Sequence, residues 1–224
     1  MEARRVIGLV AGPGETEDSA QVLVKAVLAG AREEGVKTDL IDLRTPDNPG
    51  SGESSPVPGD TGQPDGFSRI MDRIADADGI ALGTSAPGNV VPDGLESTLD
   101  HILDALSDRG LAGRFSCCVC VSGNDGAPKV LRYMDSRLER LGIAVVGGMT
   151  AVTGNEGPGP EKNRADARDL GRALARAVQM DLTDPADDPT PREKEQVRQR
   201  IKSEQDRLTG EFSSYIQNDW TNGP

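Results

Sequence analysis

A glycine-containing segment at residues 11–19 has the composition and position of a ligand-binding loop. It follows an apolar run at residues 6–10 and leads into a long helical pattern, as phosphate-binding loops of α/β proteins do. The first backbone N–H groups of such a helix lack partners inside the helix, and together with the helix dipole they can hold an anion. The same loop carries three carboxylates, Glu15, Glu17 and Asp18, which would repel a phosphate. The segment therefore indicates a site, and its acids argue against the usual occupant.

Two further segments of this kind follow later apolar runs, at residues 84–94 and 122–129. All three are rich in small and polar residues, which permit close backbone approach and offer hydroxyl or amide hydrogen bonds. Because ligands of open parallel sheets bind beyond the carboxyl ends of the strands, we expect one crevice formed by the three loops. Turns and helix starts use the same residue types, so a purely structural role stays open for each residue. The candidate binding residues are Gly12, Gly14, Thr16, Ser19, Thr84, Ser85, Pro87, Gly88, Asn89, Ser122, Gly123 and Asn124.

Five apolar runs of strand length alternate with five helical patterns along the chain. The predicted strands are residues 6–10, 38–43, 79–83, 115–121 and 143–147. The predicted helices are residues 18–34, 67–77, 95–106, 129–141 and 166–180. Strands that alternate with helices imply parallel pairing through right-handed crossovers. The sequence thus predicts an α/β fold, with a five-stranded parallel sheet that helices cover on both faces.

Composition divides the chain into a domain over residues 1–180 and a linker with a charged helix and tail over residues 181–224. Asp and Pro dominate the linker, and the helical pattern at residues 192–208 has few apolar residues. This helix either lies in solvent or contacts a partner subunit, and both interpretations stay open. Residues 44–66, rich in Pro, Gly, Ser and Asp, predict a surface loop, with closure over a ligand as one use.

Charge and composition exclude several classes of function. The net charge of −12 and the 3% aromatic content argue against nucleic-acid binding. No apolar stretch is long enough to span a membrane, and the first residues do not form a signal peptide, so we expect a cytoplasmic protein. The three cysteines, Cys117, Cys118 and Cys120, lie on one apolar run, which predicts a cluster of buried thiols without a disulfide or a metal.

The sequence motifs do not indicate a hydrolase or a protein that binds nucleoside triphosphates. Ser85 and Ser122 lack the Gly-x-Ser-x-Gly elbow, and the single histidine, His101, lies in a helical pattern, where a surface or subunit contact is expected. The first loop lacks Gly-x-Gly-x-x-Gly and also lacks the Gly-Lys-Ser/Thr ending of a nucleotide-triphosphate loop.

A series of segments shows the order found in a known family: the first strand, loop and helix through residues 30–35, then residues 39–43, 75–84, 99–101, 111–114, 122–126 and 141–147. Through them the chain resembles the flavodoxin-like NAD(P)H-dependent FMN reductases over residues 4–180. The resemblance implies a flavodoxin-like three-layer sandwich, FMN with NADPH or NADH as cofactors, and a homodimer or homotetramer. The chain departs from the family pattern in two places. Glu15 stands about where the family has a basic residue, and the loop at residues 84–89 lacks the family's aromatic residues.

The resemblance also implies roles for the candidate residues. Thr16 and Ser19 would bind the FMN phosphate. Thr84, Gly88 and Asn89 would face the pyrimidine edge of the flavin ring, and Gly123 and Asn124 its other flank. The implied function is an FMN-binding, NAD(P)H-dependent oxidoreductase. The alternative is a flavodoxin-fold protein without flavin that acts as a binding or scaffold module.

Overall fold

The computed structural model describes residues 4–13, 19–44, 66–87, 90–106, 109, 111–123, 126–152 and 159–179. Five parallel strands form one sheet in the order β2-β1-β3-β4-β5. The strands are β1 (Arg5–Ala11), β2 (Lys37–Asp42), β3 (Gly79–Ala86), β4 (Phe115–Ser122) and β5 (Ala144–Val152). The predicted five-stranded parallel sheet is confirmed. Its three central strands are buried almost throughout, as their continuous apolar runs require.

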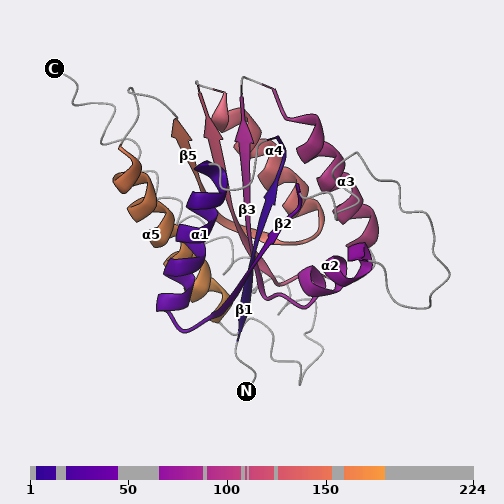
Figure 1. Cartoon of the computed structure of the whole chain (residues 1–224). Coiled ribbons are helices and arrows are strands. Elements are labelled where there is room, and N and C mark those ends of the chain that lie inside the picture. Colours follow the sequence, from indigo (N-terminus) through magenta and orange to yellow (C-terminus); the bar gives the residue numbers. More distant parts are fainter. Residues whose placement is uncertain are drawn as a thin grey trace, which may run out of the picture.

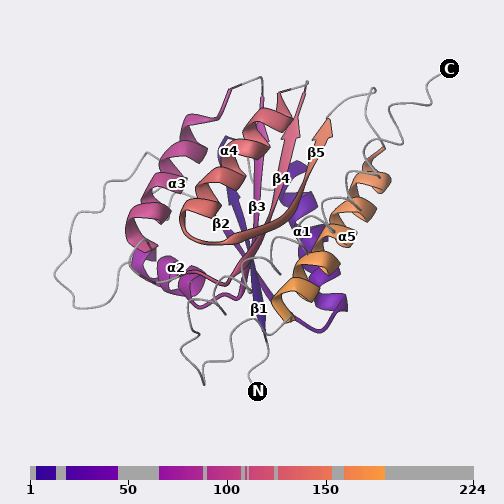
Figure 2. The same cartoon turned by 180° about the vertical axis from the view of Figure 1, so that it is seen from behind.

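Helices cover both faces of the sheet, as predicted (Figure 1, Figure 2). They are α1 (Ser19–Glu33), α2 (Gly66–Ala75), α3 (Asp93–Leu106), α4 (Ala127–Arg140) and α5 (Pro160–Gln179). α1 and α5 pack with the sheet in one apolar core, and α2, α3 and α4 enclose a second core on the opposite face. The result is a three-layer sandwich.

α1 and α5 approach each other at two glycines. A Cβ atom at Gly30 would lie 2.0 Å from the carbonyl oxygen of Arg168, and one at Gly171 would lie 1.9 Å from that of Val27. No side chain fits between the helix backbones at these positions. The glycines therefore set the distance between the two helices that cover this face.

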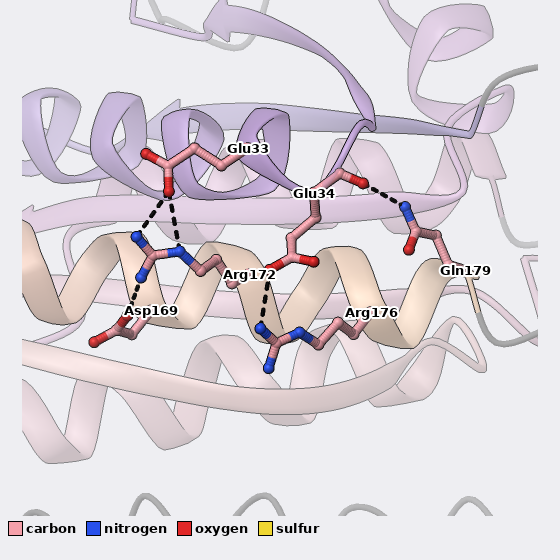
Figure 3. Close-up of polar contacts among 6 residues, drawn as sticks. All are labelled: Glu33, Glu34, Asp169, Arg172, Arg176 and Gln179. Atoms are coloured by element: carbon pink, nitrogen blue, oxygen red, sulfur yellow. Dashed lines mark hydrogen bonds and ion pairs between the residues drawn. The ribbon is translucent and has the colours of Figure 1, made fainter.

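Exposed ion pairs also join the end of α1 to α5 (Figure 3). Nη2 of Arg172 lies 2.7 Å from Oε2 of Glu33, and Arg172 also pairs with Asp169. Nη2 of Arg176 lies 2.9 Å from Oε1 of Glu34. Exposed pairs add little stability individually, so packing at the glycines dominates this contact.

Two elements extend farthest beyond their predicted bounds. β5 continues five residues beyond the predicted end at residue 147, because its pairing with β4 continues from Gly147 opposite Cys117 to Val152 opposite Ser122. α5 begins at Pro160, six residues before the predicted start. Proline suits this position because a first-turn residue has no helical acceptor for an N–H group.

The three cysteines are free and buried, as expected, but they do not form a single cluster. Side chains alternate along a strand, so Cys117 lies in the core under α1 and α5, whereas Cys118 and Cys120 lie in the core under α4. The predicted helix at residues 192–208 and most of the predicted loop at residues 44–66 lie outside the described residues. None of the helices in the described part of the chain is long and apolar enough to cross a membrane.

Candidate functional site

The loops after β1, β3 and β4 leave the same edge of the sheet. Ala11 at the end of β1 is level with Thr84 on β3, and Ala86 at the end of β3 is level with Ser122 at the end of β4. From β1 the chain passes first to β2 on one side and then to β3 on the other. The winding therefore reverses between β1 and β3, which is where open α/β sheets bind ligands.

A pocket of about 520 Å³ lies at this switch point. That volume falls within the range of pockets for small molecules and cofactors, roughly 300–1,000 Å³. The pocket joins the loop after β1 to the segment that leads from β3 into α3. Its lining residues are Gly12, Pro13, Pro87, Val90, Val91, Pro92, Asp93 and Gly94.

Gly12 brings the two segments of the pocket together. Its φ of +97° favours glycine, and a Cβ atom there would lie 2.5 Å from Oγ1 of Thr84. A Cβ atom at Gly94 would lie 3.7 Å from the Cα atom of Gly12. The backbones thus meet closely beside the pocket, and a larger residue at position 12 would have to displace Thr84.

Seven of the twelve candidate residues lie in the described part of the chain. Gly12 and Pro87 line the pocket, while Ser19, Ser85 and Gly123 are at least partly exposed on the same edge. Thr84 and Ser122 are buried in their strands, and Oγ1 of Thr84 donates a hydrogen bond of 3.4 Å to the carbonyl oxygen of Ser85. Gly14, Thr16, Gly88, Asn89 and Asn124 lie outside the described residues.

Most residues that line the pocket were not predicted as binding residues. Residues 84–94 were expected to border the crevice, yet Pro13 and the residues from Val90 to Gly94 were not among the candidates. Pro92 followed by Asp93 is a typical helix start, and that signal could have brought the first turn of α3 into the site.

A second polar group lies at the carboxyl end of β2, beside the first turn of α1. The guanidinium of Arg44 contacts both carboxylate oxygens of Asp42, at 2.9 and 2.8 Å, and Nε2 of Gln21 donates to Asp42 at 3.1 Å. Burial alone would raise the pKa of Asp42, but the hydrogen bonds from Arg44 hold this pKa below its usual value. Arg44 and Asp42 therefore form a charged pair at neutral pH.

The described lining of the pocket consists of glycine, proline and valine residues with one aspartate. Asp93 is the single ionisable residue among these described lining residues. Among the residues described, no group of three or more His, Cys, Asp or Glu side chains could hold a metal ion. Hydride-transfer cofactors need a shaped site and supply the reactive atoms themselves, so this inventory suits a cofactor-dependent reaction.

Comparison with known proteins assigns the chain to a family. The family model described as NADPH-dependent FMN reductase matches residues 5–157. No curated protein matches the chain.

Solved structures share the fold at low sequence identity. RosB with a bound 8-demethyl-8-formylriboflavin-5'-phosphate intermediate is 16% identical, over 90% of this chain and 88% of its own, with a TM-score of 0.62. An oxidoreductase from Corynebacterium diphtheriae is 18% identical over 79% of this chain and 98% of its own, with a TM-score of 0.57. Two-electron reduced flavodoxin from Megasphaera elsdenii is 17% identical over 76% of this chain and 98% of its own, with a TM-score of 0.50.

Proposed function

Since the chain belongs to the NADPH-dependent FMN reductase family, we propose that the crevice at the ends of β1, β3 and β4 is its flavin site. The function is that of an FMN-binding oxidoreductase, with FMN and NADPH as cofactors. When bound, FMN accepts a hydride from the nicotinamide, and the protein contributes binding and orientation. Family membership does not favour the alternative of a flavin-free scaffold.

The position of the pocket is the observation that carries this assignment. It lies between the ends of β1 and β3, where the winding of a flavodoxin-like sheet reverses and where such sheets bind FMN. Its volume suits a cofactor, and Gly12 lets the loop after β1 lie close to Thr84 and the start of α3 beside it. These features support the assignment of the flavin to this crevice.

The roles of individual residues are part of the proposal. Residues of the first loop, Gly12, Gly14, Thr16 and Ser19, would hold the phosphate, and Ser85, Pro87, Gly88 and Asn89 would border the ring together with Ser122, Gly123 and Asn124. Thr84 is fully buried with its hydroxyl beside Gly12. We therefore assign Thr84 to positioning the backbone of Gly12, in place of a direct contact with the flavin.

Three further properties belong to the proposal. The folded domain comprises residues 1–180, with residues 181–224 as a linker and tail. The protein works in the cytoplasm. It assembles as a homodimer or homotetramer, with α3 or the tail at the subunit contact.

Titration of the purified protein with FMN and with riboflavin tests the function. We expect a shift of the visible flavin absorbance with FMN, and FMN-dependent oxidation of NADPH, with NADH assayed in parallel. Absence of both would contradict the proposal.

Reversal of a charge in the first loop locates the phosphate. Glu15→Arg removes a negative charge near the α1 N-terminus and adds a positive one, worth about 1 kcal/mol or roughly a fivefold tighter Kd for FMN. Riboflavin lacks the phosphate and serves as the control, because its affinity should not change. Equal effects on the two flavins, or no effect on FMN, would place the phosphate elsewhere.

A further inference from the structure

Val90 exposes an apolar side chain at the pocket. It is 72% exposed, and no other large apolar side chain in the described part of the chain is exposed to a comparable degree. It lines the pocket together with Pro87, Val91 and Pro92. Together these side chains give the pocket a largely apolar lining, which suits an apolar surface of a ligand.

The charge of the lining indicates which part of a flavin covers this surface. Among the described residues that line the pocket, Asp93 is the single ionisable one, and none is Lys or Arg. A phosphate would meet a carboxylate here without a compensating cation. The isoalloxazine ring is uncharged when oxidised, flat and largely apolar, so it matches proline and valine side chains better than the phosphate does.

Two aromatic residues whose side chains the structure describes, Phe115 and Tyr133, lie elsewhere. Phe115 begins β4, at the edge of the sheet opposite to the pocket. Tyr133 lies on α4, where its ring faces the guanidinium of Arg137 at 5.0 Å and its hydroxyl accepts a hydrogen bond from Arg137. Neither residue lines the pocket.

We propose that Val90, with Pro87 and Pro92, forms an aliphatic wall against the face of the isoalloxazine ring. This inference rests on the proposed flavin site and adds what contacts the ring. It has an optical consequence. Tyrosine and tryptophan stacked on a flavin quench its emission by electron transfer, whereas valine and proline cannot donate an electron. FMN bound at this wall therefore stays fluorescent.

Four proteins test the wall: the full-length wild type, Val90→Ser, Val90→Trp and the control Ala165→Trp, which places a tryptophan at an exposed position on α5. Each is titrated with FMN and with riboflavin, and both Kd and the emission of the bound flavin are measured. Val90→Ser should raise Kd about five- to tenfold for both flavins, because it removes apolar contact with the ring and leaves the phosphate contacts intact. Val90→Trp should lower Kd and quench the bound flavin. The control should change neither quantity.

The outcomes separate this inference from the function on which it rests. Failure of the wild type to bind either flavin overturns the proposed flavin site itself. Flavin binding with strongly quenched emission in the wild type overturns the aliphatic wall, as does an unchanged Kd in Val90→Ser. A Kd that rises for FMN but not for riboflavin in Val90→Ser also overturns it, because the phosphate would then lie at Val90.

Discussion

Asp135 on α4 holds a carboxyl group against the buried thiol of Cys118 on β4. Burial raises the pKa of Asp135 to about 6, although the hydrogen bond with Cys118 lowers it. Its Oδ1 atom is buried without a hydrogen-bond partner. Burial also raises the pKa of Cys118 well above its usual value, so this thiol stays protonated. The pair therefore places a carboxyl group where its charged form is poorly solvated.

This arrangement predicts a dependence of stability on pH. The folded protein binds the Asp135 proton more tightly than the unfolded chain, whose carboxyl has a pKa near 3.8. The stabilising contribution is fully present below that pH and is lost as the pH rises through about 6. Asp135→Asn should therefore increase the free energy of unfolding by about 1–2 kcal/mol near neutral pH and have less effect in acid. Urea unfolding at the two pH values measures the difference.

A matched control removes a charge from a solvated site. Glu161 is exposed in the first turn of α5, and Glu161→Gln should change stability by only a few tenths of a kcal/mol. If Asp135→Asn stabilises the protein equally in acid and at neutral pH, the carboxyl group does not titrate as its burial requires.

At the scale of elements, local sequence patterns predict which helices and strands exist better than they predict where each one ends. All ten elements of the described core follow from apolar runs and helical spacing. The fifth strand was predicted to end at Gly147, where its apolar run ends, but pairing with the distant β4 continues the strand to Val152. The crevice was predicted because strand ends of a parallel sheet share an edge. Val90 was missed because its exposure depends on how the segment before α3 folds.

The contact between α1 and α5 gives a prediction at this scale. Gly30→Ala places a Cβ atom against the backbone of α5, where 2.0 Å is available, so the helices must separate. Alanine favours the helix by up to about 1 kcal/mol over glycine, but overpacking typically costs about 1–3 kcal/mol or more. We expect net destabilisation, measured as a lower urea midpoint. Gly159→Ala is the control, because nothing lies within 4 Å of its added Cβ atom. An unchanged midpoint for Gly30→Ala would contradict the close helix contact.

At the scale of the whole molecule, the described core spans nearly the whole of the predicted domain at residues 1–180. Its apolar residues extend from Val6 to Val178 along the sequence. At the end of α5, Nε2 of Gln179 donates a hydrogen bond of 2.7 Å to the carbonyl oxygen of Glu34 (Figure 3). The last described helix is thus tied to α1.

Truncation after residue 180 tests the predicted domain boundary. The shortened protein should unfold cooperatively with a Tm within a few degrees of the full-length value, and it should bind FMN with an unchanged Kd, because both cores and the pocket stay intact. Truncation after residue 159 is the control. It removes α5, and with it Leu170, from the core that also contains Val27 of α1, so this variant should fail to fold.

Size-exclusion chromatography of the 1–180 fragment then decides the role of the tail. Loss of the oligomer with retained folding would assign residues 181–224 to a partner subunit, whereas an unfolded 1–180 fragment would contradict the boundary.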